Sequence, residues 1–87
     1  MRNWKHTLDL KDIYKSAGDY SFEQLGEMIA KKIEPLKIKM DNDVMLDKIQ
    51  DMFNGGSCAM CDANDFNYAM SLLYDFGDCY GVWVKTS

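Results

Sequence analysis

Hydrophobic and polar residues alternate at both ends of the chain, and this period-two pattern predicts a β-strand at each end. In residues 3–8, Trp4 and His6 lie on the apolar side of the alternation. Residues 80–85 alternate as well and are rich in β-branched and aromatic side chains. Because each strand would otherwise leave a bare edge, we expect the two strands to pair and the termini to meet. Trp4 or Trp83 is expected at the seam between this sheet and the helices.

Between the strands, apolar residues first recur with the spacing of two helices. A brief helix is predicted after Asp9, which can cap it, and its expected end is Gly18. Ser21 and Gln24 then form a capping box, which begins a longer helix. Pro35 is expected to stop this helix, because proline lacks the backbone N–H that a helix interior needs. The apolar face of the longer helix consists of Phe22, Leu25, Ile29, Ile33 and Leu36.

Two further helices are predicted after a polar connection at residues 37–42. The first of them ends at residues 54–56, an Asn-Gly-Gly sequence, and Asn64 or Asp65 can cap the second. Gly77 is the expected end of that last helix. The apolar faces consist of Met45, Ile49, Met52 and Phe53 in the third helix and of Phe66, Ala69, Met70, Leu73 and Phe76 in the fourth.

These elements predict a small α+β fold. Three to four helices would pack on a two-stranded sheet formed by the N- and C-terminal strands, in a single domain over residues 1–87. The chain has 47% hydrophobic residues and one proline, a composition typical of folded globular proteins. No apolar run has the length of a signal peptide or of a membrane span. We therefore expect a cytoplasmic protein with no membrane contact.

The charge of the chain is divided unevenly. Residues 1–39 hold eight Lys or Arg against six Asp or Glu, a net +2, whereas residues 40–87 hold two against eight, a net −6. An acidic surface repels phosphate backbones and attracts basic protein surfaces. The second half therefore predicts a partner protein with a basic surface and no direct binding of nucleic acid. The alternative is an acidic surface that only keeps the protein in solution.

The acidic residues of the second half lie on the two predicted helices, with tyrosines between them. Carboxylates steer toward Lys and Arg, and tyrosine supplies contact area at low entropic cost, a combination typical of protein–protein interfaces. Asp41, Tyr74 and Tyr80 belong to this surface. The predicted partner-binding residues are Asp43, Asp47, Asp51, Asp62, Asp65, Tyr68, Asp75 and Asp78.

The three cysteines raise the possibility of a structural zinc site. Cys58 and Cys61 have the C-x-x-C spacing of half a zinc site, and Cys79 and His6 are the other available ligands. The second paired spacing of a zinc motif is missing, so the default interpretation is free thiols and no cofactor. Thioredoxin-like redox chemistry is disfavoured, because the pair follows a helix and a Gly-Gly turn rather than a strand. Zinc coordinated by these four residues remains the alternative.

The sequence supports no enzymatic activity. His6 is the single histidine and lies on the expected buried face of a strand. The Gly-Gly pair lacks the lysine and hydroxyl residue of a phosphate-binding loop. Seven methionines also suggest an adaptable binding groove, but core positions explain most of them. Met28, Met40 and Met60 are the ones expected at the surface.

The C-terminal part resembles the ending of small proteins carried by bacteriophages and prophages. The resemblance lies in Asp65-Phe66-Asn67-Tyr68, in the run from Leu72 to Asp78 and in Val82-Trp83-Val84-Lys85-Thr86. It implies an accessory protein that binds and blocks a host protein in the host cytoplasm, as anti-CRISPR and other counter-defence inhibitors do. Our first hypothesis is such a non-enzymatic inhibitor. The alternatives are a zinc-stapled domain and a homodimerising domain, and both a monomer and a homodimer remain open.

Overall fold

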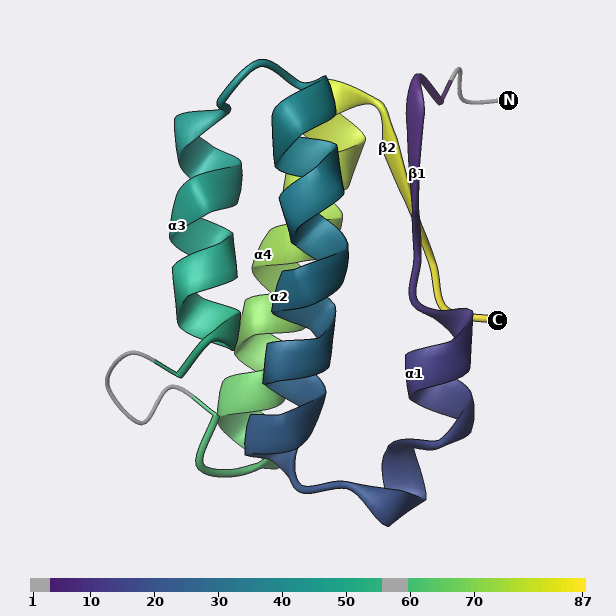
Figure 1. Cartoon of the computed structure of the whole chain (residues 1–87), viewed down its shortest axis with the longest axis vertical. Helices are drawn as coiled ribbons and strands as arrows, with labels where there is room; N and C mark the ends of the chain where they lie inside the picture. The colour runs from purple at the N-terminus through teal and green to yellow at the C-terminus, as the bar shows by residue number, and fades with distance from the viewer. Residues whose placement is uncertain (1–3, 56–59) are drawn as a thin grey trace.

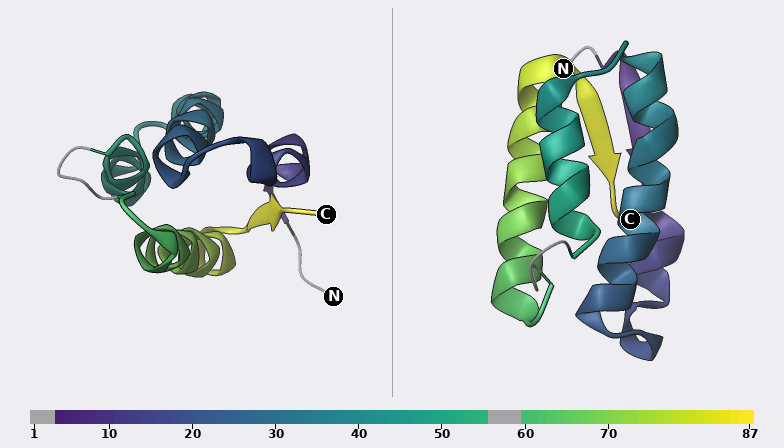
Figure 2. Two further views of the ribbon diagram at one scale, coloured as in Figure 1. Left: turned by 90° about the horizontal axis from the view of Figure 1, so that it is seen from below. Right: turned by 60° about the vertical axis from the view of Figure 1, so that its left-hand side comes forward.

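In the part of the chain that the structure describes, the sequence between the two strands forms four α-helices (Figure 1). This structure is a computed structural model, and it describes residues 4–55 and 60–87. The helices are α1 (Lys11–Lys15), α2 (Phe22–Lys39), α3 (Val44–Phe53) and α4 (Ala63–Tyr80), with a 3-10 turn, η1 (Ala17–Asp19), between α1 and α2. Helices α2, α3 and α4 lie side by side, and the sheet with α1 occupies the remaining side between α2 and α4 (Figure 2). The predicted α+β fold is confirmed.

The sheet joins the two ends of the chain. β1 (His6–Asp9) and β2 (Val82–Lys85) pair in parallel, as two neighbouring strands of four residues each (Figure 1). Val82 and Val84 are buried against the helices, so Trp83 between them faces outward and is 42% exposed. The expected pairing of the termini is confirmed. Of the two tryptophans expected at the seam, Trp83 is not there, because valines occupy the inward positions of β2, whereas Trp4 lines a hollow between β1 and α2.

Helix α1 differs from the prediction at both ends. Its N-cap is Leu10 and not Asp9, although the Asp9 carboxylate accepts a hydrogen bond from the Lys11 backbone N–H at 3.0 Å. The helix ends at Lys15, and the Ser16 hydroxyl donates to the Asp12 carbonyl at 2.8 Å. Gly18 is therefore not the residue that ends α1, because it lies within the separate turn η1.

Helix α2 begins as predicted and ends later than predicted. The Ser21 hydroxyl accepts from the Gln24 N–H at 3.2 Å, and the Gln24 side chain accepts from the Ser21 N–H at 2.9 Å, which confirms the capping box. Pro35 lies inside the helix, which continues to Lys39. Proline deprives the Lys31 carbonyl of its helical partner, but both residues are exposed, so water can satisfy that carbonyl.

Helix α3 buries a slightly different face from the one predicted. Its buried residues are Leu46, Ile49, Gln50 and Phe53, whereas Met45 is 49% exposed. The expectation that Met45 belongs to the core is therefore wrong, because Leu46 takes the inward position in that turn. The helix packs on both α2 and α4, and it is capped by the Asp43 carboxylate, which accepts from the Leu46 N–H at 3.1 Å.

Helix α4 has the predicted core face and different ends. Phe66, Ala69, Met70, Leu73 and Phe76 are all buried, as expected. The N-cap is Asp62, whose carboxylate accepts from the Asp65 N–H at 3.0 Å, and not Asn64 or Asp65. The helix ends at Tyr80, followed by the C-cap Gly81 with a φ of 75°, and not at Gly77. Gly77 instead lies in the helix, where a Cβ atom would collide with the Val82 carbonyl oxygen of β2.

The methionines also differ from expectation. Met60, expected at the surface, is 3% exposed and lies against Gly26 of α2, while Met28 and Met40 are partly buried. In the described residues, none of the helices has the length and apolar character needed to cross a membrane.

Candidate functional site: the α3–α4 face

An apolar groove of about 470 Å³ lies between α3 and α4. The side chains that line it come from both helices and are mostly apolar. They are Met45, Lys48, Ile49 and Met52 of α3 and Leu72, Asp75, Phe76, Cys79 and Tyr80 of α4. We call this surface the α3–α4 groove. Its volume lies within the range of pockets that bind ligands in proteins.

Helical spacing explains how the groove forms. On α3, Met45, Ile49 and Met52 follow one another at i, i+4 and i+7, and on α4, Leu72, Phe76 and Cys79 do the same. Each set forms a stripe on its helix. Ile49 and Phe76 are buried and also belong to the core, whereas Met45 is exposed and Met52 is partly buried. The apolar stripe of each helix is therefore wider than the core requires, and its outer part lines the groove.

Aromatic stacking shapes one end of the groove. The rings of Phe76 and Tyr80 stack with centroids 4.7 Å apart and an angle of 28° between their planes. Phe76 is buried, while Tyr80 is exposed. The stack therefore connects the core to an exposed aromatic surface at the C-terminal end of α4. Cys79, an exposed free thiol, lies next to this stack in the groove.

Part of the predicted acidic surface lies beside the groove. Asp65, Tyr68, Leu72 and Asp75 occur at i, i+3, i+7 and i+10, so they share one face of α4. Tyr68 is 62% exposed, Asp75 is exposed and Asp65 is half-buried. On α3, Asp51 is exposed, but it is one residue before Met52 and so points about 100° around the helix from it. On α4 the structure brings apolar and acidic side chains together on one face.

Three of the eight predicted binding residues have structural roles instead. Asp43 and Asp62 cap the N-termini of α3 and α4, where each carboxylate accepts a backbone N–H. Asp47 forms an ion pair with Lys37 of α2, with the Lys37 Nζ and Asp47 Oδ1 atoms 2.7 Å apart. These three carboxylates are already engaged. Asp78 is exposed and is not one of the residues that line the groove.

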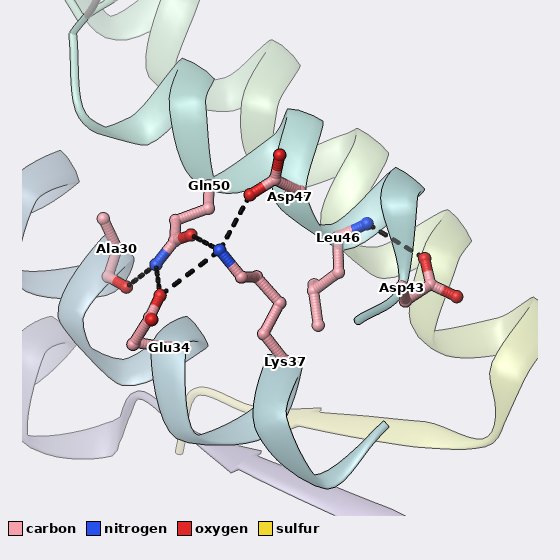
Figure 3. Close-up of polar contacts among 7 residues, drawn as sticks. All are labelled: Ala30, Glu34, Lys37, Asp43, Leu46, Asp47 and Gln50. Atoms are coloured by element: carbon pink, nitrogen blue, oxygen red, sulfur yellow. Dashed lines mark hydrogen bonds and ion pairs between the residues drawn. The ribbon is translucent and has the colours of Figure 1, made fainter. Parts of the chain in front are cut away.

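Asp47 belongs to a polar network between α2 and α3 (Figure 3). At its centre is Gln50, 7% exposed, whose amide donates to the Ala30 carbonyl at 3.0 Å and to Glu34 Oε2 at 2.7 Å. Lys37 Nζ donates to the Gln50 side-chain oxygen at 2.6 Å and lies 3.4 Å from Glu34 Oε2. Every polar group of the Gln50 side chain is therefore engaged. The sequence contained a signal for this network, namely a single glutamine on the buried face of α3.

The network changes the acidity of its ionisable groups. The hydrogen bond from Gln50, followed by the contacts with Lys37, lowers the pKa of the Glu34 carboxyl. The hydrogen bond to Asp47 raises the pKa of the Lys37 ammonium. Both shifts favour the charged forms. The seam between α3 and α2 is therefore closed by a network in which the Lys37 ammonium contacts two carboxylates, and the exposed carboxylate that lines the α3–α4 groove is Asp75.

The structure does not bring the four candidate zinc ligands together. Cys61 precedes α4 and Cys79 lies near its end, so a helix of 18 residues, roughly 27 Å long, separates them. One zinc ion, which binds sulfur at about 2.3 Å, cannot reach both. His6 lies on β1, and Cys58 lies outside the described residues. Across residues 4–55 and 60–87, no three or more His, Cys, Asp or Glu side chains cluster as a metal site would require.

Comparisons with known proteins do not identify the site. The chain matches no protein-family model, no curated protein and no solved structure. The resemblance to phage proteins therefore stays a prediction. The α3–α4 groove and the charges beside it are the observations from which a function can be inferred.

Proposed function

We propose that this protein is a non-enzymatic binding protein and that its α3–α4 groove binds an amphipathic, basic helix of a partner protein. The observation that carries the proposal is the combination of an apolar groove of about 470 Å³ with exposed carboxylates beside it. An amphipathic helix commonly binds a partner by placing its apolar face in such a groove. Its polar flanks then meet the residues along the edges of the groove.

The shape and lining of the groove favour a helix as the occupant. Two helices form its walls, and the lining extends from Met45 to Met52 on one and from Leu72 to Tyr80 on the other, about two helical turns each. A helical partner with apolar residues at i, i+3 or i+4 and i+7 presents a stripe of the same length. Met45 and Met52 provide flexible, polarizable side chains that adapt to the shape of what they contact.

The charge of the surface favours a basic partner. Lys48 and Lys85 are the only basic residues in the second half of the sequence, against eight aspartates. Asp75 and Lys48 both line the groove, and the exposed Asp51 and half-buried Asp65 lie on the two helices that form it. Lys and Arg side chains on the flanks of a bound helix would meet these carboxylates, which mainly increases the rate of association and the specificity.

We further propose that the partner is a host protein and that the chain acts as a phage-encoded inhibitor. The sequence resemblance over residues 65–86 supports this origin, and these residues include most of α4. An acidic inhibitor would occupy a host site that has basic residues for binding nucleic acid. The same exposed apolar groove also supports a second candidate function, homodimerisation through the α3–α4 face.

A designed helical probe tests the groove directly. The probe is a labelled peptide of about four helical turns with leucines on one face and lysines on the other, and glutamates replace the lysines in its matched control. Fluorescence anisotropy measures binding of both peptides to the purified protein. We expect the lysine peptide to bind and the glutamate peptide to bind at least about tenfold more weakly. Equal affinity for the two peptides would contradict the proposal.

Variants locate the binding to the groove. Leu72→Gln removes apolar contact area from the groove and should weaken binding of the lysine peptide by about tenfold or more. Asp75→Asn should weaken it by a few-fold, mainly at low salt. Asp19→Asn is the matched control, because it removes an exposed carboxylate of η1 outside the groove. Unchanged binding by Leu72→Gln would exclude the groove. A mass of two chains in native mass spectrometry, lost in Leu72→Gln, would favour the homodimer instead.

A further inference from the structure

A second groove, of about 390 Å³, lies between β1 and α2. One wall is formed by the six consecutive residues 4–9, and the other by one face of α2. The residues of that helical face are Lys32, Pro35, Leu36 and Lys39, at i, i+3, i+4 and i+7. We call this surface the β1–α2 groove. It is separate from the α3–α4 groove, with which it shares no residue.

The β1–α2 groove follows the backbone edge of β1. Side chains of a strand point alternately to the two faces of a sheet. Consecutive residues of β1, with side chains on both faces, line this groove, so the groove follows the edge of the strand. The N–H groups of His6 and Leu10 donate to the Gly81 and Lys85 carbonyls of the β2 side, at 3.1 and 2.8 Å. Because hydrogen-bonding direction alternates along a strand, Thr7 and Asp9 direct their backbone N–H and C=O groups toward the groove.

The opposite edge of the sheet is closed. The Val82 carbonyl of β2 lies so close to α4 that a Cβ atom at Gly77 would collide with it. Helix α4 therefore covers the edge of β2. Within residues 4–55 and 60–87 the sheet has two strands, so β1 has the edge that remains open. An open edge is a template for another strand, because its backbone groups are already aligned.

The charge around the open edge is positive. Lys5, Lys32 and Lys39 are exposed in the groove, with Asp9 as the acidic residue. Beyond Lys32 a second hollow, of about 350 Å³, continues between α1 and α2, where Lys31 adds a further positive charge and Asp12 a negative one. The first half of the chain has a net charge of +2, in contrast to −6 in the second half. An occupant with acidic residues complements this surface.

We propose that the β1–α2 groove binds an acidic peptide segment in extended conformation, which adds to β1 as a third strand. Backbone hydrogen bonds with Thr7 and Asp9 provide affinity in this mode, and the lysines select acidic side chains. From Met28 to Lys39 the two hollows extend along about 16 Å of α2. An extended segment of about five residues spans that length. The aligned backbone groups favour a peptide over a nucleic acid, whose recognition they do not require.

Selection from a displayed library of random eight-residue peptides tests this proposal on the intact protein. We expect the enriched peptides to carry Asp or Glu at alternate positions, and fluorescence anisotropy with one of them then measures affinity. Enrichment of basic peptides, or of none, would overturn the proposal. An oligothymidylate of equal charge that binds more tightly than the peptide and displaces it would also overturn it, in favour of nucleic acid.

Two variants separate the strand edge from the charges. Thr7→Pro removes the backbone N–H directed at the groove, at a position where an edge strand tolerates proline, and should weaken peptide binding about tenfold or more. Thr7→Val keeps the N–H and should bind as the wild type does. Lys32→Glu combined with Lys39→Glu should also weaken binding about tenfold or more. Binding that Thr7→Pro leaves unchanged would overturn the third-strand geometry.

Two measurements keep the result interpretable. If Thr7→Pro does not fold, as judged by circular dichroism, the selected peptide with N-methylated backbone nitrogens replaces it as the test on wild-type protein. Loss of binding on N-methylation supports the proposal, and retained binding overturns it. The lysine-rich helical probe of the α3–α4 groove should bind Thr7→Pro normally, so failure of this proposal is distinguishable from failure of the proposed function.

Discussion

The two sides of α3 illustrate two different ways in which helices of one small domain meet. Toward α2, the seam is closed by the Gln50 network (Figure 3). It is also closed by the close approach of Gly26 to the Phe53 carbonyl. Toward α4, the helices meet through the buried Ile49 and Phe76, and the outer side chains leave a groove. The comparison teaches that both sides hold α3 in place, but only toward α4 do the outer side chains of the packed surface stay open to a partner.

The largest expected effect concerns the closed seam. In Gly26→Ala the new Cβ atom would lie 2.5 Å from the Phe53 carbonyl oxygen and 2.8 Å from Met60 Cγ, so α2 and α3 would have to separate. We expect the free energy of unfolding to fall by about 1–3 kcal/mol, the usual cost of overpacking a core. Urea denaturation followed by circular dichroism measures it.

Gly18→Ala is the matched control for this substitution. A Cβ atom at Gly18 meets nothing within 4 Å. We expect the free energy of unfolding to stay equal or to rise by up to about 1 kcal/mol, because alanine restricts the unfolded chain. If the two glycine variants lost stability equally, the close approach of α2 and α3 would not be a determinant of the seam.

The next effect concerns the Gln50 network. Gln50→Met keeps the size of the side chain but removes its hydrogen bonds to Ala30, Glu34 and Lys37. We expect the free energy of unfolding to fall by about 1 kcal/mol. Because Lys37 shares a hydrogen bond with Gln50, the double variant with Lys37→Met should lose less than the sum of the two single variants. Additive losses would show that the two side chains act independently.

A third effect depends on pH. The pKa of Glu34 is lowered by its contacts with Gln50 and Lys37, so in the folded protein Glu34 holds its proton less tightly than its ordinary value of 4.5 implies. Its contribution to stability is therefore present above pH 4.5 and is lost as the pH falls below that value toward the lower folded pKa.

Carboxyl carbon NMR measures this titration. We expect the Glu34 pKa to lie below 4.5 in the wild type and to move toward 4.5 in Gln50→Met, because Gln50 is the largest cause of the shift. Glu34→Gln should make the loss of stability between pH 5 and 3, measured by urea denaturation, shallower. A Glu34 pKa that does not respond to Gln50→Met would show that the hydrogen bond from Gln50 does not lower the pKa of Glu34.

The smallest effect on stability is expected on the open side. Met45 is 49% exposed in the α3–α4 groove, so Met45→Gln should change the free energy of unfolding by no more than about 0.5 kcal/mol. The same variant should weaken binding of the lysine-rich helical probe, because it removes apolar contact area. A loss of stability as large as that of Gly26→Ala would show that the groove belongs to the core. The two sides of α3 would then not differ in how tightly they are packed.

Local patterns predicted the parts of the fold that depend on neighbouring residues. The capping box of Ser21 and Gln24 and the buried face of α4 follow from hydrogen bonding and spacing within one helix, and both are confirmed. The roles of Asp43 and Asp62 as N-caps were also available from sequence, because aspartate commonly takes that position. Both aspartates were predicted to bind a partner, but their carboxylates cap α3 and α4 instead.

The helix ends predicted at a glycine and a proline were wrong where packing determined the role of these residues. Gly77 was expected to end α4, yet it lies inside the helix because the Val82 carbonyl leaves no room for a side chain. Pro35 was expected to stop α2, yet the buried Ile33 and Leu36 on either side keep that segment packed as a helix. In both cases packing against another element of the fold decides the outcome.

By itself, the sequence determined the α+β class, the pairing of the two terminal strands and the division of charge between the halves, because periodicity and composition are properties of the chain alone. Only the tertiary structure decided which carboxylates are engaged within the fold, where the α3–α4 groove opens and which edge of the sheet stays uncovered. These features depend on how helices are rotated and spaced against one another. That arrangement is set by packing of many side chains at once, which no local pattern specifies.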